Sequence, residues 1–83
     1  MCYVYVIYNK DYGKIYIGQC KNTEDRLKMH NNKTFKNSYT AKFDGIWDLI
    51  YKEEAKDRLA ALAREKQLKS YKGRLFIKNF IPR

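Results

Sequence analysis

The sequence predicts a single α/β domain, because three strand-like segments alternate with segments of helical periodicity and no linker divides the chain. Strand patterns cover residues 2–8, 14–19 and 46–51, and turn chemistry separates the first two. Helical patterns cover residues 22–30 and 55–71. The 83 residues are expected to form one domain with a thin core and no large enclosed cavity.

The first two predicted strands form a hairpin. The register that buries most apolar surface places four aliphatic side chains on one face: Val4, Val6, Ile15 and Ile17. The opposite face then carries three tyrosines and a glycine: Tyr3, Tyr5, Tyr16 and Gly18. Because Gly18 has no side chain, a backbone or a ligand can approach the tyrosines closely at this point.

The first predicted helix begins at Asn22, which is a suitable N-cap for the Asp25 amide, and ends near His30. Arg26 and His30 are four residues apart, so they project from one face of this helix. Residues 31–45 are polar, contain lysines and aromatic residues, and are expected to form a loop.

The third strand alternates and is expected to place three side chains on one side: Trp47, Leu49 and Tyr51. Core packing is the expected role of Trp47, rather than stacking on bases.

The second predicted helix carries an apolar stripe that is expected to face the sheet, formed by Ala55, Leu59, Leu62 and Ala63. Glu65 lies at the edge of this stripe, between Leu62 and Leu68. Gly73 is expected to end the helical pattern, and residues 74–81 to form a short helix or a docked strand.

Composition narrows the class of partner. The chain has 18 Lys and Arg against 9 Asp and Glu, a formal net charge of +9, together with eight tyrosines. Cations release counterions from polyanions and aromatic rings stack on bases, so nucleic acid is the expected partner. Basic charge that serves solubility alone is the plainer alternative.

Targeting signals and cysteines add further expectations. No apolar window of about 18 residues, signal-peptide pattern or separate basic amphipathic segment is present, so we expect a cytoplasmic protein without a membrane partner. Cys2 and Cys20 are too few for a disulfide scaffold or a structural zinc site. The hairpin register directs them to opposite faces, and both are expected to be reduced.

Several side chains suit phosphodiester hydrolysis, which needs an activated water, a cation at the phosphate oxygens and help for the leaving alkoxide. Tyr5 and Tyr16 could pair, with one phenol acting as general base, although paired strand tyrosines also occur as simple packing. Arg26 could bind a phosphate, or be an ordinary surface arginine. His30, the single histidine, could relay a proton or act as a helix cap.

Glu65 is the candidate metal ligand. Mg²⁺ and Mn²⁺ prefer oxygen donors and often combine one or two carboxylates with waters and substrate phosphates. The alternative is a surface ion pair between Glu65 and Lys69, four residues later.

These residues follow a recognisable order. Tyr3-Val4-Tyr5 and Tyr16-Ile17-Gly18, followed by Arg26, His30 and Glu65, resemble the motifs of the GIY-YIG endonuclease superfamily over nearly the whole chain. The resemblance is greatest to the small stand-alone branch that is similar to the nuclease module of the excision-repair incision subunit and to intron homing endonucleases. Three further segments echo that branch: Tyr39-Thr40, Leu49-Ile50-Tyr51 and residues 65–69.

The resemblance implies an α+β fold, with a three-stranded antiparallel sheet flanked by helices. It also implies metal-dependent DNA cleavage with low sequence specificity, for which branched or damaged DNA in repair is a candidate substrate. One Mg²⁺ or Mn²⁺ ion would be held by Glu65. Tyr5 would be the general base supported by Tyr16, with Arg26 at the scissile phosphate and His30 assisting.

Three positions depart from the family pattern or align uncertainly with it. Tyr3-Val4 replaces Gly-Ile in the first motif, which keeps Tyr5 in place. Gln19 stands where repair-type members carry lysine, so the cation near the base would come from elsewhere, with Lys14 as the candidate. Asn79 either corresponds to a late asparagine found in several members or is simply exposed.

Nucleic-acid binding is expected to use six cations: Lys14, Lys28, Lys33, Lys69, Lys72 and Arg74. DNA is the expected substrate, but nothing in the sequence reads the 2′-hydroxyl and RNA stays open. Two alternatives also stay open, namely a non-catalytic nucleic-acid-binding module with the nuclease fold and a subunit that is active only with a protein partner. The chain is expected to be a monomer or a weak dimer.

Overall fold

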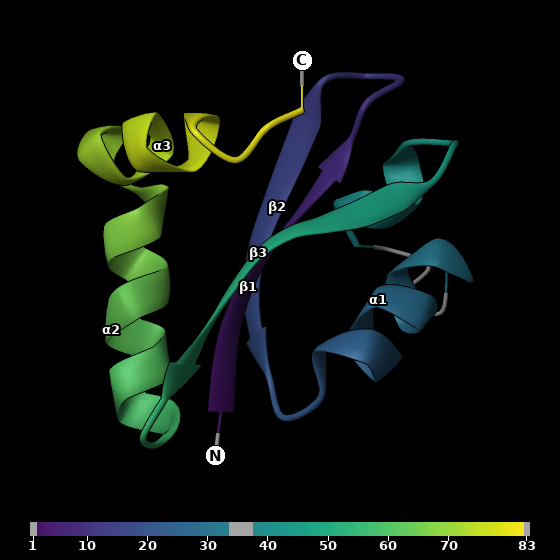
Figure 1. The fold of residues 1–83 in the computed structure, drawn as a ribbon. Helices are drawn as coiled ribbons and strands as arrows, with labels where there is room; N and C mark the ends of the chain where they lie inside the picture. Colours follow the sequence, from purple (N-terminus) through teal and green to yellow (C-terminus); the bar gives the residue numbers. More distant parts are fainter. Residues whose placement is uncertain (1, 34–37, 83) are drawn as a thin grey trace.

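The computed structural model describes residues 2–33 and 38–82, in which helices lie on both faces of an antiparallel sheet (Figure 1). The elements follow in the order β1 (Cys2–Asn9), β2 (Lys14–Cys20), α1 (Thr23–Asn31), the 3₁₀ turn η1 (Thr40–Lys42), β3 (Trp47–Ala55), α2 (Arg58–Lys69) and α3 (Tyr71–Lys78). The sheet of this part of the chain has three strands in the order β2-β1-β3. The predicted fold, a three-stranded antiparallel sheet flanked by helices, is therefore confirmed.

The predicted hairpin register is confirmed as well. Tyr5 pairs with Gly18 and Val6 pairs with Ile17, so the aliphatic and tyrosine-bearing faces are separated as expected. Cys2 and Cys20 lie in the two different core layers, and both are free thiols. Because β1 is central, β2 and its outer backbone form one edge of the sheet.

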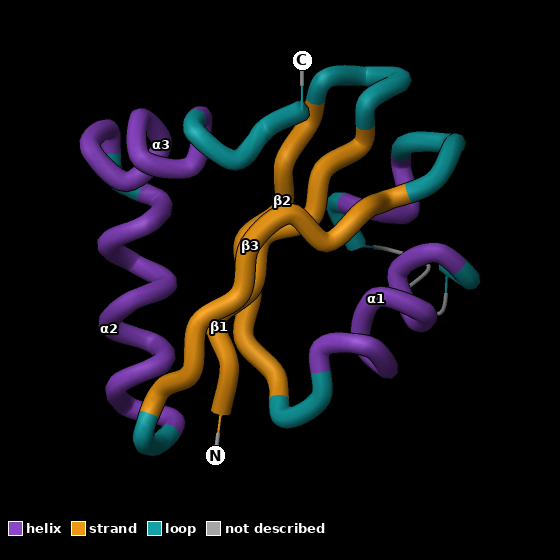
Figure 2. The backbone as a smooth tube through the Cα atoms, viewed as in Figure 1, coloured by secondary structure: helices purple, strands orange, loops and turns teal. Residues whose placement is uncertain are grey.

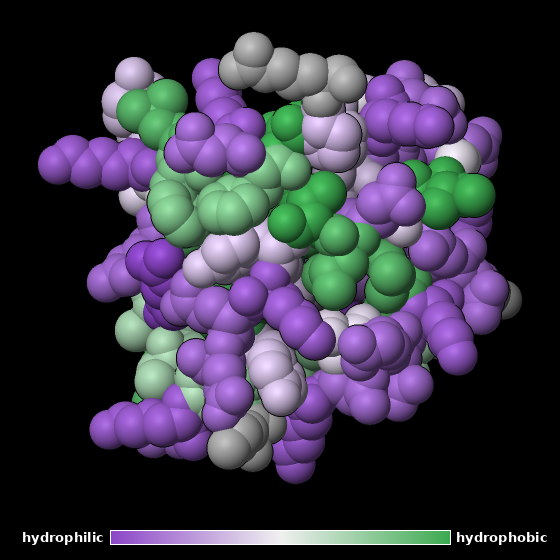
Figure 3. Space-filling view, in the orientation of Figure 1, coloured by the Kyte–Doolittle hydropathy of each residue, from purple (hydrophilic) through white to green (hydrophobic). Residues whose placement is uncertain are grey.

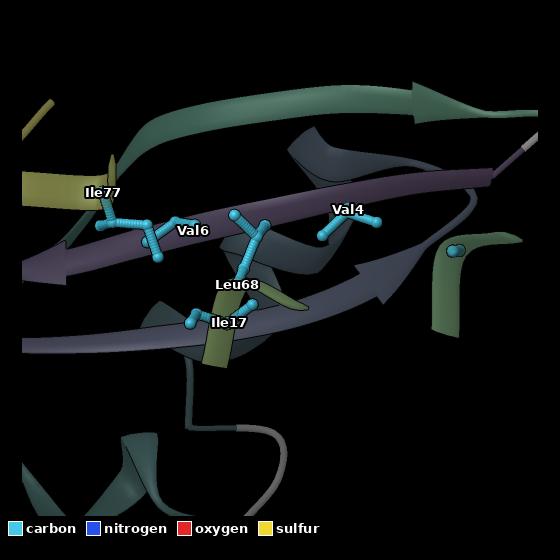
Figure 4. Packing of buried hydrophobic residues seen from close by; sticks show 6 residues of the cluster. Val4, Val6, Ile17, Leu68 and Ile77 are labelled. Atoms are coloured by element: carbon cyan, nitrogen blue, oxygen red, sulfur yellow. The ribbon is translucent and has the colours of Figure 1, made fainter. Parts of the chain in front are cut away.

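The core consists of one apolar layer on each face of the sheet. Helices α2 and α3 cover the aliphatic face, and α1 covers the other (Figure 2). Figure 4 shows the first layer, in which helix side chains meet the strands: Val4, Val6, Ile17, Leu68 and Ile77. The second layer contains Tyr5, Ile7, Cys20 and Trp47, and only 1% of Trp47 is exposed.

The prediction for the faces of β3 was wrong at Tyr51. A β-bulge lies in the pairing of β1 with β3, so that Tyr51 is opposite Val6 while Leu49 is opposite Ile7. The extra residue reverses the alternation of side chains. Tyr51 consequently packs on the aliphatic face, against Phe76 and Phe80 of the C-terminal segment, whereas Trp47 and Leu49 belong to the other face.

The predicted stripe of the second helix was also wrong. Strand β3 continues to Ala55, so α2 does not begin until Arg58. Asp57 is its N-cap, and the Asp57 side chain accepts a hydrogen bond from the Ala60 amide at 2.8 Å. The buried positions of α2 are Ala61 and Leu68, while Leu59 is 78% exposed. Because the side chain of Ala61 is small, α2 can lie close to the sheet at this residue. The face of α2 that packs on the sheet is therefore not its most apolar face.

The break between the last two helices lies at Ser70 rather than at Gly73. Ser70 ends α2, and its hydroxyl accepts a hydrogen bond from the Gly73 amide at the start of α3. A Cβ atom at Gly73 would collide with the Gln67 carbonyl and with Leu68, so glycine permits the close turn between the helices. Residues 74–81 thus form the rest of α3 and a short tail, not a docked strand.

The predicted loop 31–45 includes residues 34–37, which lie outside the described part, and it contains η1. The space-filling view shows a largely hydrophilic face with apolar patches toward its middle (Figure 3). Within the described ranges, every helix is too short or too polar to cross a bilayer.

Candidate active site

Two tyrosines and a histidine form a cluster on the face of the sheet that α1 covers. Strands β1 and β2 supply Tyr5 and Tyr16, and the last turn of α1 supplies His30. The Tyr5 hydroxyl lies 2.9 Å from Nε2 of His30, within hydrogen-bond distance. The Tyr16 ring centroid lies 6.2 Å from that of Tyr5 and 5.0 Å from that of His30. Residues that are distant in the sequence therefore meet in one place.

Gly18 makes room for this cluster. A Cβ atom at position 18 would lie 2.7 Å from the Tyr5 hydroxyl, 2.9 Å from Cζ of Tyr5 and 3.0 Å from a ring carbon of Tyr16. Tyr5 itself is 1% exposed and pairs directly with Gly18 across the strands. The missing side chain therefore allows the buried phenol of the central strand to lie against the edge strand.

His30 is held by a second hydrogen bond on its other nitrogen. Its Nδ1 lies 2.8 Å from the Thr40 hydroxyl of η1, which in turn lies 3.1 Å from the Ser38 hydroxyl. Only 3% of His30 and 1% of Thr40 are exposed. A chain of polar groups thus runs from Tyr5 through the imidazole into the loop before β3.

Sequence reasoning did not assign a role to Thr40 or Ser38. Thr40 appeared only as part of a segment that echoes relatives, and ten residues separate it from His30. No periodicity links a helix residue with a loop residue at that distance. The contact exists because η1 folds back over the end of α1.

Electrostatics favour the uncharged forms of both Tyr5 and His30 at the centre of the cluster. Burial raises the pKa of Tyr5 well above its usual range, the neighbouring Tyr16 raises it further, and Arg26 opposes the shift. Burial lowers the pKa of His30, and the charge of Arg26 lowers it as well. At neutral pH the phenol of Tyr5 therefore keeps its proton and the imidazole of His30 is uncharged.

Arg26 of α1, one turn before His30, is a cation whose charge lowers the pKa of Tyr5 and opposes the effect of burial. That Lys14 replaces the lysine expected at Gln19 stays a prediction. Lys14 lies at the hairpin end of β2, opposite Asn9, and its ammonium is 6.0 Å from the ring centroid of Phe43. Gln19 and Arg26 line one hollow of the surface, whereas Lys14 lines another.

Glu65 projects from α2, the helix on the opposite face of the sheet. It lies on the buried line of that helix between Ala61 and Leu68, and its side chain is 19% exposed. The charge of Glu65 contributes to the raised pKa of Tyr5, which links it electrostatically to the cluster. The structure therefore brings Tyr5, Tyr16 and His30 into contact, while Arg26 and Glu65 act on Tyr5 through their charges.

The donor set around Glu65 fits a hard divalent cation. Its Oε2 lies 2.7 Å from the ammonium of Lys69, so the carboxylate already pairs with a cation at this position. Among the residues described, no group of three or more His, Cys, Asp and Glu side chains forms a metal site. A single carboxylate that leaves most coordination positions to water and phosphate is typical of Mg²⁺ rather than of structural zinc.

The candidate nucleic-acid-binding residues do not all gather in one place. Three of them border a groove of about 450 Å³ along β2, namely Lys14, Lys69 and Arg74. Lys28 is exposed on α1, and Lys72 lines a separate hollow beside α3. Lys33 donates a hydrogen bond to the Phe43 carbonyl at 3.1 Å, so it holds the loop.

Asn79 is exposed at the C-terminal end of α3. A second hollow, of about 470 Å³, brings Arg26 together with two cations that sequence reasoning did not single out, Lys21 and Arg58. No sequence signal pairs these two, because they come from the loop before α1 and the first turn of α2.

Comparison with protein families identifies the family of this chain. Residues 1–79 match the family described as the GIY-YIG catalytic domain, which confirms the resemblance of the motifs. Comparisons with curated proteins and with solved structures give no match.

Proposed function

The chain belongs to the GIY-YIG nuclease family, and on that premise we propose that it is an endonuclease that hydrolyses DNA phosphodiester bonds with the help of a divalent metal ion. The observation that carries the proposal is the 2.9 Å contact between the Tyr5 hydroxyl and Nε2 of His30, beside Tyr16 and Arg26. A buried polar chain of this kind is positioned to move a proton rather than to pack a core.

The proton path follows from the tautomer of His30. When Nδ1–H donates to the Thr40 hydroxyl, Nε2 can accept a hydrogen bond, and then the proton, from the Tyr5 hydroxyl. Because burial keeps the Tyr5 hydroxyl protonated, Tyr5 would not be a phenolate before the reaction begins. Instead it would take a proton from the attacking water while its own proton passes to His30, which becomes an imidazolium.

The other residues complete the proposed reaction. Arg26 would bind the phosphate and stabilise the charge that develops on its oxygens as the water oxygen attacks phosphorus. Tyr16, which is more exposed than Tyr5, would orient the water or the phosphate. Glu65 would hold Mg²⁺ or Mn²⁺, which supplies further charge neutralisation at the phosphate and the leaving oxygen.

The substrate class rests on charge. A net charge of +9 favours DNA through its phosphates, and phosphate contacts carry no sequence information. We therefore propose cleavage with low sequence specificity and salt-sensitive binding. Branched or damaged DNA is the proposed substrate in a repair process, by analogy with the excision-repair branch of the family.

One observation favours a second candidate, a non-catalytic module that binds nucleic acid. The ammonium of Lys69 pairs with the carboxylate of Glu65, so this carboxylate is not available to a metal ion in this arrangement. Tyr5 is buried and protonated, so its phenol does not act as a base in this arrangement. A chain of this design would bind DNA without cutting it, or would need a partner that releases Glu65.

Cleavage of labelled branched, linear and single-stranded DNA in Mg²⁺ or Mn²⁺ separates the candidates. Tyr5→Phe and Glu65→Gln should each lower the cleavage rate about a hundred- to a thousandfold, since each would remove a group that acts in the transition state, worth about 2.7 to 4 kcal/mol by analogy with other such groups. The matched controls are Tyr71→Phe, at a tyrosine that is 78% exposed, and Glu54→Gln on β3.

Three outcomes are informative. Parental rates in Tyr5→Phe and Glu65→Gln would contradict the assigned roles. If the parent binds but cuts none of these substrates, the binding module is the better description. Cleavage that appears only after a cell extract is added would indicate a partner.

A further inference from the structure

The groove along β2 combines an exposed sheet edge, positive charge and aromatic rings. It follows the outer side of the strand, which has no neighbouring strand among the residues described. Tyr16 and Tyr39 line it from the side of the tyrosine cluster, and Lys69 and Arg74 line it from α2 and α3. Because Tyr16 belongs to the candidate active site, the groove leads directly away from that site.

The charge of the groove selects an anionic occupant. Lys14 and Arg74 contribute two cations, Lys69 contributes a third that is paired with Glu65, and none of the described lining residues is acidic. A free strand edge could also accept a peptide in an extended conformation. Cations spaced along both sides of the edge fit a phosphate backbone better than a peptide strand.

Tyr39 adds a surface on which a base can stack. Its side chain belongs to an exposed residue, at 41% exposure, and its ring is nearly parallel to that of Tyr16, with an interplanar angle of 23° and centroids 6.4 Å apart. Phe43 and Trp47 also lie close to the Tyr39 ring, in edge-on and tilted arrangements at centroid distances of 5.2 and 6.5 Å. A ring that is held by neighbouring aromatic rings and is still 41% exposed can serve as a platform on which a base stacks.

We propose that this groove holds an unpaired nucleotide next to the scissile phosphate, with its base on Tyr39 and its backbone on Lys14 and Arg74. The volume of about 450 Å³ lies within the range of about 300 to 1,000 Å³ for small-ligand sites, which suits one nucleotide. The position relative to the cut rests on the proposed function, whereas the binding does not. The substrate class is then nucleic acid with a single-stranded segment at the cleavage point, such as a flap or gap, rather than continuous duplex.

Fluorescence anisotropy without metal tests binding separately from cleavage. The parent should bind a labelled single-stranded oligonucleotide more tightly than the same sequence as a blunt duplex. Tyr39→Ala should weaken the single-strand complex about five- to a hundredfold, the range expected for one lost base stack, and leave the duplex complex nearly unchanged. Tyr39→Phe should retain parental affinity, because the ring remains.

Two controls separate stacking from charge and from folding. Tyr71→Ala removes an exposed tyrosine outside the groove and should change neither affinity. Lys14→Ala combined with Arg74→Ala should weaken both complexes and reduce their dependence on salt.

A spectroscopic measurement on the parent avoids any effect of Tyr39→Ala on folding. 2-Aminopurine placed at successive positions of the oligonucleotide should be quenched on binding at one position. Absence of quenching at every position, or parental single-strand affinity in folded Tyr39→Ala, overturns the proposal. An extended peptide would then be the better candidate for the ligand at the edge of β2. These results do not depend on the cleavage test, so a chain that cuts nothing could still bind the unpaired nucleotide.

Discussion

Replacing Gly18 by alanine should destabilise the domain through the tyrosine cluster. The new methyl group would lie 2.7 Å from the Tyr5 hydroxyl and 2.9 Å from its Cζ, closer than packed carbon and oxygen atoms allow. The Tyr5 ring cannot yield easily, because it is 1% exposed and its hydroxyl contacts His30 at 2.9 Å. Either the ring leaves its position or β2 moves outward.

The expected change can be worked from these contacts. Overpacking of a core by one methyl group costs about 1 to 3 kcal/mol. Loss of the contact with His30 would add about 1 kcal/mol. Alanine lowers the conformational entropy of the unfolded chain relative to glycine, which offsets about 0.4 to 1 kcal/mol of this loss of stability. The free energy of unfolding should therefore fall by about 1 to 3.6 kcal/mol, a large part of the roughly 5 to 15 kcal/mol typical of a domain.

Urea unfolding followed by the fluorescence of the single tryptophan, Trp47, measures this change. The same substitution in a Tyr5→Phe background tests the cause. Without the hydroxyl, the closest contact of the new methyl group disappears, so Gly18→Ala should destabilise that background less. Equal unfolding free energies in Gly18→Ala and the parent, or an equal loss in both backgrounds, would refute the reasoning.

Three further predictions concern the polar chain and the carboxylate. Because the pKa of His30 is lowered in the folded state, the unfolded state binds more protons, so stability should fall as the pH drops below about 6.5, and the urea midpoint of His30→Gln should depend less on pH between 7.5 and 5. Thr40→Val should reduce the free energy of unfolding by about 1 to 3 kcal/mol, because it leaves buried Nδ1 of His30 without its partner, and a parental urea midpoint would contradict the contact. Lys69→Ala should strengthen Mn²⁺ binding about twofold, measured by electron paramagnetic resonance, since a surface pair worth about 0.3 to 0.5 kcal/mol no longer competes for Glu65. Lys66→Ala, on the same helix, should leave the Mn²⁺ affinity unchanged and serves as the control.

Local patterns in the sequence were sufficient for the hairpin and the first helix. The alternation of apolar residues in β1 and β2 allowed one register, because a slip of one residue would expose the aliphatic face. The N-cap at Asn22 was also predictable, since its side chain accepts a hydrogen bond from the Asp25 amide three residues later. Both features depend on residues that lie close together along the chain.

The faces of β3 and α2 that are buried could not be predicted from local sequence patterns, because they depend on packing. The bulge in β3 moved Tyr51 to the other face, and contact with the sheet selected Ala61 and Leu68 of α2 instead of the more apolar line through Leu59. Periodicity describes an isolated helix or strand. It does not contain the irregularity of a neighbouring strand or the space available under a helix.

By itself, the sequence determined the family, the hairpin register and the order of the candidate site residues, because ordered motifs and alternation are properties of the chain. Only the tertiary structure decided that Thr40 contacts His30, that the charge of Arg26 acts on the pKa of Tyr5, and that Lys69 pairs with Glu65, whose side chain is 19% exposed. These contacts join elements whose relative orientation is set by the two core layers on either side of the sheet.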